Sequence, residues 1–131
     1  MEQFRCSVPV LLIAFNRPDV TSKVFEAIRR AAPQCLYVAI DGPRPGYPED
    51  RGKVDEVQRI VAAVDWDCTV RTLFQKTNLG CRRGVNAAIS WFFENEEMGI
   101  ILEDDCVPDQ TFFRFCEELL EYYRKLAEGK P

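Results

Sequence analysis

The chain has 131 residues, of which 47% are hydrophobic and 29% are charged, so its size and composition are those of one folded domain. The net charge is −4 with acidic and basic residues interspersed, which excludes the basic surface of a typical nucleic-acid-binding protein. The absence of histidine excludes Ser-His and Cys-His nucleophilic catalysis and argues against a zinc site. No apolar run reaches the length of a transmembrane helix.

The six cysteines are spread along the sequence without a C-x-x-C pair. This scatter predicts reduced, partly buried thiols in a cytoplasmic protein, and a disulfide scaffold is the weaker interpretation. We therefore expect no disulfide. The cysteines are Cys6, Cys35, Cys68, Cys81, Cys106 and Cys116.

The first predicted strand covers residues 8–15, whose almost continuous apolar run is typical of a central parallel strand buried on both faces. Pro18 then suits the first turn of a helix, which places Arg17 at the helix boundary. Pro33 ends this helix. Its apolar face is predicted from residues at helical spacing, which are Val20, Val24, Ala27, Ile28 and Ala31.

The second predicted strand covers residues 36–40 and ends at Asp41. Residues 42–48 follow, and five of these seven are Gly or Pro, which predicts a long rigid loop. The third strand, residues 68–75, alternates in polarity and has one more polar face, so we predict that it lies at an edge of the sheet. The helix between these strands is marked by Val54, Val57, Ile60, Val61 and Val64.

The fourth predicted strand, residues 100–102, is apolar and runs directly into three carboxylates at positions 103–105. Unpaired carboxylates are too costly to bury, so the strand should leave the core where the charges begin. The helices on either side carry apolar stripes that we expect to belong to the core. These stripes are Val85, Ala88, Ile89, Phe92 and Phe93, and Phe112, Phe115, Leu119, Leu120, Tyr123 and Leu126.

Four strand–helix pairs in succession predict an α/β fold with three layers, in which helices cover both faces of a mainly parallel sheet. The sequence contains neither the G-x-G-x-x-G pattern of dinucleotide-binding folds nor the G-x-x-x-x-G-K-[ST] pattern of P-loop proteins. A nucleotide site of either kind is therefore excluded.

The carboxyl ends of parallel strands meet at one edge of a sheet, so Arg17, Asp41 and residues 103–105 should converge there. Arg17 at a helix amino end could hold phosphate, and Asp41 could accept hydrogen bonds from a base or ribose. The carboxylates could hold Mg²⁺ or Mn²⁺ together with substrate phosphates. Arg17, Asp41 and Asp105 are expected to lie outside the core and to matter little for folding.

Each position also has a simpler interpretation. Arg17 could be a surface residue at a helix start, and Asp41 could be a turn residue before Gly42. Glu103 and Asp104 could be solvated loop charges, and Asp105 or Asp109 could cap the next helix. It is the presence of three such positions at one edge that favours a site.

Four segments resemble one enzyme family in combination. They are V-P-V-L-L-I-A-F-N-R-P at 8–18, V-A-I-D-G at 38–42, N-L-G at 78–80 and I-I-L-E-D-D-C-V-P-D-Q-T-F-F at 100–113. The chain resembles the amino-terminal, nucleotide-binding half of GT-A-fold glycosyltransferases, most closely the N-acetylglucosaminyltransferase I group. In that group E-D-D is the version of the D-x-D metal motif.

The resemblance implies strand order 3-2-1-4 and a UDP-sugar donor bound with Mn²⁺ or Mg²⁺. It assigns direct metal contact to Asp105. Arg82 and Arg83 follow N-L-G and could face the donor, but the resemblance gives them no defined role. The nucleotide-binding residues that it implies are Phe15, Asn16, Arg17, Asp41, Glu103 and Asp104.

The resemblance also implies that residues 1–131 are one nucleotide-sugar-binding domain of a larger glycosyltransferase. An acceptor-binding half beyond residue 131 would carry the catalytic base, so no catalytic residue is assigned within the chain. This part alone is expected to bind donor and metal without transferring sugar to an acceptor glycan or other hydroxyl compound.

Two alternatives to the enzyme remain open. One is a non-catalytic module that binds nucleotide sugars. The other, weaker alternative is a receiver-like signalling domain that binds Mg²⁺. Receivers gather acids after their first and third strands, whereas the third strand here ends in Phe74-Gln75-Lys76.

Overall fold

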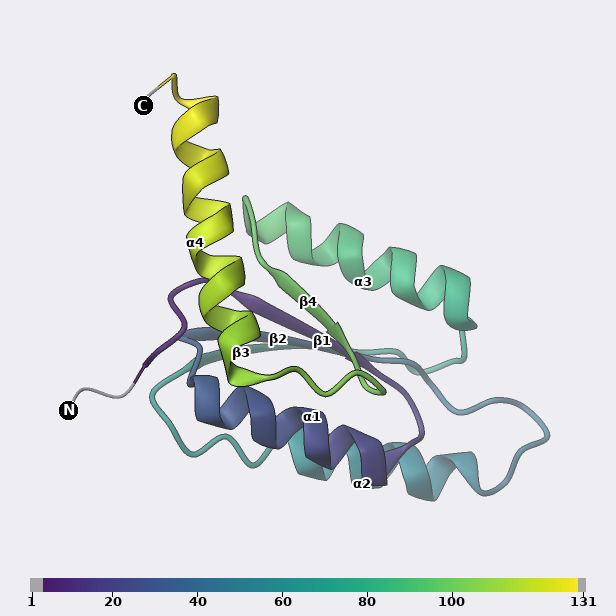
Figure 1. Ribbon diagram of the computed structural model, residues 1–131. Coiled ribbons are helices and arrows are strands. Elements are labelled where there is room, and N and C mark those ends of the chain that lie inside the picture. Colours follow the sequence, from purple (N-terminus) through teal and green to yellow (C-terminus); the bar gives the residue numbers. More distant parts are fainter. Residues whose placement is uncertain (1–3, 130–131) are drawn as a thin grey trace.

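The computed structural model describes residues 4–129, which fold as four strands alternating with four helices (Figure 1). Each predicted element is present, with strand ends that differ from the expected ones by one or two residues. The elements are β1 (Val10–Ala14), α1 (Pro18–Ala31), β2 (Cys35–Ile40), α2 (Asp50–Val61), β3 (Thr69–Phe74), α3 (Cys81–Asn95), β4 (Ile100–Glu103) and α4 (Gln110–Ala127).

The four strands form one parallel sheet in the order β3-β2-β1-β4, which confirms the predicted α/β class and strand order. β1 lies in the interior, where Val10 pairs with Leu36 of β2 on one side and Ile100 of β4 on the other. Its continuous apolar sequence suits that place because both of its faces are covered. β3, the strand with polar alternation, lies at one edge as predicted.

Helices cover both faces of the sheet and produce two apolar cores. On one face, alternate strand residues such as Leu12 and Val38 pack with α1, α2 and Phe113 of α4. On the other face, Leu11 and Tyr37 pack against Phe92 of α3. Figure 1 shows α3 on one side of the sheet and α1 and α2 on the other. The three-layer arrangement is therefore confirmed.

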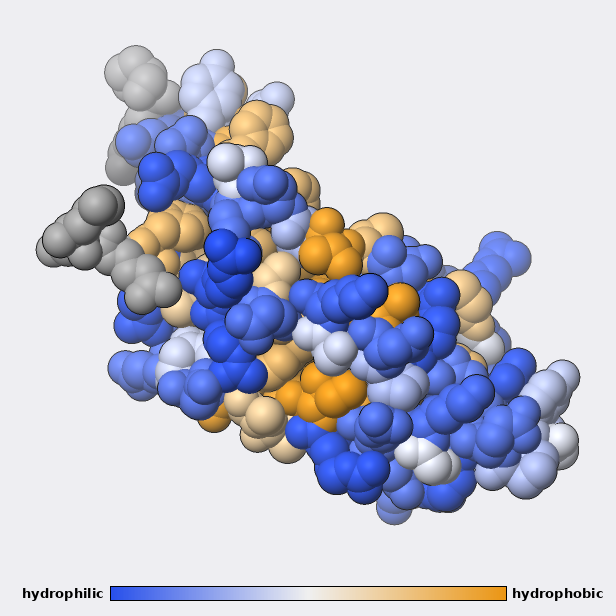
Figure 2. Space-filling view, turned by 60° about the horizontal axis from the view of Figure 1, so that its bottom comes forward, coloured by the Kyte–Doolittle hydropathy of each residue, from blue (hydrophilic) through white to orange (hydrophobic). Residues whose placement is uncertain are grey.

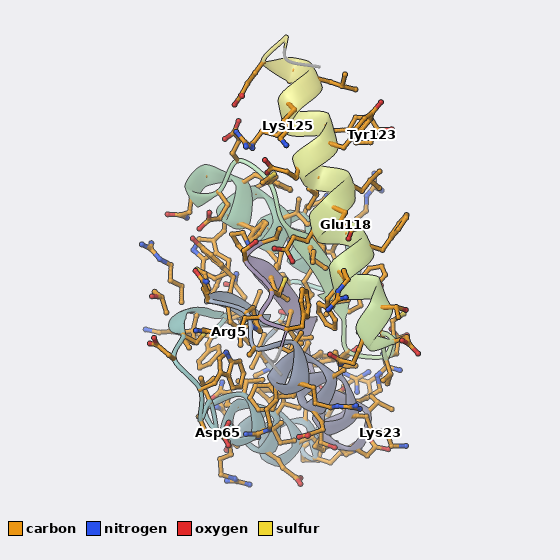
Figure 3. The ribbon with its side chains drawn as sticks, turned by 60° about the vertical axis from the view of Figure 1, so that its left-hand side comes forward. Arg5, Lys23, Asp65, Glu118, Tyr123 and Lys125 are labelled. Carbon is orange, nitrogen blue, oxygen red and sulfur yellow. The ribbon has the colours of Figure 1, made fainter. Side chains whose placement is uncertain are left out.

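The expectation that the apolar stripe of α4 belongs to the core is wrong for most of its length. Phe113, which is outside the predicted stripe, is the buried residue of this helix. Leu120 is half-buried. Only the first turns of α4 lie near α1, and the rest extends past the sheet, where Figure 3 shows Tyr123 and Lys125 (Figures 1 and 3). The exposed stripe residues are Phe112, Phe115, Leu119, Tyr123 and Leu126.

The predicted stripe of α3 is also exposed in part, because Phe93 is 46% accessible to solvent while the adjacent Phe92 is fully buried. Elsewhere the surface seen in Figure 2 is largely hydrophilic, and apolar side chains appear on it in a few patches. None of the helices within residues 4–129 is both long enough and apolar enough to cross a lipid bilayer.

Candidate functional site

A cleft of about 400 Å³ opens at the edge of the sheet where the strands end. The strands end toward the right-hand side of Figure 1. The cleft is bordered by the segments that follow all four strands. All seven residues that the sequence singled out for nucleotide or metal binding line this cleft. They are Phe15, Asn16, Arg17, Asp41, Glu103, Asp104 and Asp105.

The position of the cleft follows from the strand order. From β1 the chain proceeds outward through β2 to β3, and it then crosses back through α3 to place β4 on the other side of β1. Open α/β sheets bind ligands at such a reversal, because the connections leave in opposite directions and open a crevice between them. The cleft extends from this switch point along the edge toward β3.

At the β1–β4 end, one arginine contacts two carboxylates. The Nη2 atom of Arg17 lies 3.1 Å from Oδ1 of Asp104 and 3.6 Å from Oδ2 of Asp105. Asp104 is 6% exposed and is therefore buried. The simpler interpretation, in which Asp104 is a solvated loop charge, is wrong for this residue. Burial raises the pKa of its carboxyl group, and the nearby Arg17 guanidinium opposes this rise.

The other two carboxylates of the triplet are open to solvent. Glu103 and Asp105 are exposed, and the Asp105 side chain retains 48% of its accessibility. Glu103 ends β4 on the exposed side of the strand, and of the two turn residues that follow, Asp104 is buried and Asp105 is exposed.

No group of three or more Asp, Glu or Cys side chains within residues 4–129 is arranged to enclose a metal ion. A closed metal centre therefore does not fit this part of the chain. The fit is better for Mg²⁺ or Mn²⁺ held by one or two carboxylates together with substrate phosphates and water, because such ions seldom occupy all-protein cages. Glu103 and Asp105, both exposed at the cleft, are the carboxylates that could supply ligands of that kind.

Both carboxylate oxygens of Asp41 accept hydrogen bonds from the protein itself, which the position of Asp41 in the sequence does not reveal. Its Oδ1 accepts hydrogen bonds from the backbone N–H groups of Gly42 and Leu79, both at 2.8 Å. Its Oδ2 accepts from the Gly80 N–H at 3.1 Å and from Nδ2 of Asn78 at 3.2 Å. Asp41 thus fastens the β3–α3 connection to the end of β2.

Two glycines allow this close approach. A Cβ atom at Gly42 would lie 2.6 Å from the backbone carbon of Thr77, so only glycine fits there. Gly80 has φ of +86°, a conformation that residues with a Cβ rarely adopt, and it precedes α3 directly. The β3–α3 connection therefore packs closely against the end of β2 and forms one wall of the cleft.

A buried carboxylate that sequence reasoning missed joins two cleft residues. Asp50, at the start of α2, is 0% exposed. It accepts hydrogen bonds from Nδ2 of Asn16 at 3.0 Å and from Nε and Nη2 of Arg44 at 2.7 and 3.0 Å. These bonds, chiefly those from Arg44, hold the pKa of Asp50 well below its usual range.

Arg44 is a second arginine of the cleft and was not among the predicted site residues. The sequence offers a weak signal for it, namely an arginine within a loop of Gly and Pro after the second strand. Nothing in the sequence indicates that Asp50 would be its partner. The adjacent pair Arg82 and Arg83 is exposed in the first turn of α3, and neither lines the cleft, although Cys81 and Gly84 do.

All six cysteines are free thiols in the structure. Cys6 is buried, and this burial raises the pKa of its thiol to about 11. Cys81 and Cys106 are exposed, and Cys81 lines the cleft. The thiols therefore differ in access to solvent.

A comparison with models of known protein families finds no match for this chain, and a search of curated proteins finds none. The fold and the cleft together define a three-layer α/β protein with a site at the topological switch point of its sheet. The ligand has to be inferred from the chemistry of the cleft, because fold alone does not determine function.

Proposed function

We propose that the chain binds a nucleoside-diphosphate sugar together with Mn²⁺ or Mg²⁺, as the donor-binding part of a glycosyltransferase. The observation that carries the proposal is one cleft that contains a cation for phosphate, Arg17, beside an exposed carboxylate for a metal, Asp105. The resemblance of the 8–18, 38–42 and 100–113 segments to GT-A-fold enzymes supports the same ligand and suggests UDP as its nucleotide.

The two ends of the cleft differ in chemistry, and this difference orients the ligand. The end near β1 and β4 carries Arg17 and the carboxylates, which suits a diphosphate and its metal. The end near β2 and β3 has apolar lining from Leu73 and Val85, which suits a flat base. A nucleotide lying along the sheet edge would place its base toward β3 and its sugar beyond the diphosphate, near Glu103.

In this arrangement Arg17 binds the diphosphate and Asp105 holds the metal. A bound divalent cation would neutralise the charge that develops on a departing diphosphate. Asp104, buried and paired with Arg17, fixes the direction of the arginine. The base that would deprotonate an acceptor hydroxyl is assigned to no residue of this chain.

The proposal is tested by calorimetric titration of the wild-type chain with UDP, in the presence and absence of MnCl₂ at matched ionic strength. We expect UDP to bind more tightly with Mn²⁺ by roughly 5–150-fold, the usual range of coupling between two ligands. Mn²⁺ alone should bind weakly, because no enclosed metal site is present within residues 4–129. Equal affinity for UDP with and without metal would refute the proposal.

The substitution Arg17→Ala is expected to weaken binding of UDP and of pyrophosphate alike. Arg17 is the cation nearest the metal-binding carboxylates, and a charged hydrogen bond contributes about 1.5–3 kcal/mol. Calorimetry of both ligands with Mn²⁺ measures the loss. Arg59→Ala, which removes an exposed arginine of α2 outside the cleft, is the control and should bind as the wild type does. A loss confined to UDP would contradict the assignment to the diphosphate.

A further inference from the structure

Arg44 is held in one orientation by three contacts. Two of its nitrogens, Nε and Nη2, donate to Asp50, and its guanidinium stacks on the ring of Tyr47 at 3.8 Å from the ring centroid. The side chain nevertheless remains 37% exposed and lines the cleft. Its third nitrogen, Nη1, has no hydrogen-bond partner within residues 4–129 and is free to donate to a ligand.

The contacts of Asp50 indicate why this arrangement exists. Every side-chain hydrogen bond of Asp50 goes to Asn16 or Arg44, and both residues line the cleft. A buried ion pair is weak evidence for a role in stability, because the desolvation of both charges offsets their attraction. A buried carboxylate can instead hold a ligand-binding side chain in one orientation, because binding sites need preorganised geometry.

The position of Arg44 determines which part of the ligand it can reach. It follows β2, so Phe15 and Arg17 after β1 lie between it and the metal-binding carboxylates of β4. Its guanidinium carbon lies 5.7 Å from the centroid of the Phe15 ring, and the strand order places the loop after β2 on the β2 side of the cleft. This is the end assigned above to the base.

We propose that Arg44 is a specificity-determining residue that donates a hydrogen bond from Nη1 to a carbonyl oxygen of the base, and that Asp50 is its positioning residue. This inference rests on the proposed function. An arginine can only donate, so where it faces the exocyclic group of the base it favours uracil, whose carbonyl oxygen accepts, over adenine, whose amino group is itself a donor. We therefore expect the chain to bind UDP more tightly than ADP.

The test measures the affinities of the chain for UDP, ADP and pyrophosphate with MnCl₂ in four proteins. These are the wild type, Arg44→Ala, Asp50→Asn and the double variant. We expect Arg44→Ala to lose about tenfold or more in affinity for UDP, as expected for a lost charged hydrogen bond, with changes below about twofold for ADP and pyrophosphate. Asp50→Asn should reduce the affinity for UDP in the same selective way.

The double variant separates positioning from a merely structural role. If Asp50 acts through Arg44, the effect of Asp50→Asn on the ratio of UDP to ADP affinity disappears once Arg44 is alanine. Circular dichroism and thermal unfolding establish that each variant is folded. Arg44→Lys, which keeps the charge but loses the two-pronged contact with Asp50, replaces Arg44→Ala if that protein does not fold. Arg51→Ala, at an exposed neighbour outside the cleft, is the matched control.

Each outcome has one meaning. A ratio of UDP to ADP affinity that is unchanged in Arg44→Ala, or equal binding of the two nucleotides by the wild type, overturns the inference and leaves metal-coupled diphosphate binding intact. Additive effects in the double variant overturn the positioning role of Asp50. Failure of the wild type to bind either UDP or pyrophosphate with Mn²⁺ overturns the inference and the proposed function together.

Discussion

Asp105→Asn is expected to abolish the metal dependence of UDP binding. The substitution removes the charge of the exposed carboxylate while changing its volume little. No group of three or more acidic or cysteine side chains within residues 4–129 encloses an ion, so the proposed metal site depends on Asp105 together with the substrate phosphates. The ratio of UDP affinities with and without Mn²⁺ should fall from roughly 5–150-fold in the wild type to within about twofold.

The measurement is the same pair of calorimetric titrations, and the control is Asp67→Asn, an exposed aspartate outside the cleft. Folding of Asp105→Asn should match the wild type, because this side chain is 48% exposed and its ion pair with Arg17 is long at 3.6 Å. Retention of the full metal effect in Asp105→Asn would show that the metal, if bound, is held elsewhere.

Asp41→Ala is expected to lower the free energy of unfolding by about 2–4 kcal/mol. The carboxylate accepts four hydrogen bonds, three of them from the β3–α3 connection, and its loss leaves several of those donors without partners. In a domain of this size such a loss lowers the midpoint of thermal unfolding by ~10 °C. Urea and thermal unfolding followed by circular dichroism measure the effect.

Asp55→Ala on α2 is the control for removing an aspartate and should unfold close to the wild type. Where Asp41→Ala remains folded, its affinity for UDP should be lower than that of the wild type. This loss should be larger than the loss of affinity for pyrophosphate. The reason is that the β3–α3 wall borders the base end of the cleft. Unchanged stability would contradict the structural role of Asp41.

This prediction replaces the expectation from sequence that Asp41 matters little for folding. That expectation followed from placing Asp41 just beyond a buried strand, which is correct. The partners of its carboxylate come from residues 78–80, about forty positions later. Nothing local to Asp41 reveals them, because they depend on the pairing of β2 with β3 and on the path of the chain after β3.

The apolar pattern of α4 failed to predict the burial of its residues for a related reason. A stripe of apolar residues at helical spacing predicts a helix, and the helix is present. The stripe does not indicate how much of the helix packs against other elements of the fold. Only the beginning of α4 lies near α1, so Phe113 is buried while Phe115 is 60% exposed.

The sequence patterns by themselves determined the four strand–helix pairs, the parallel sheet, the polar edge strand and the convergence of Arg17, Asp41 and residues 103–105 on one cleft, whereas Phe15 and the strand order came from the family resemblance. These follow from local patterns, because strand polarity and helix periodicity are encoded by near neighbours, and parallel strands share one carboxyl edge. The tertiary structure alone decided which side chains at that edge form hydrogen bonds or ion pairs within the protein. Asp41 fastens a wall, Asp104 turns inward to Arg17, and the buried Asp50 holds Arg44. Such pairings join residues from different loops and depend on distances of a few ångströms, which only the assembled sheet and its connections set.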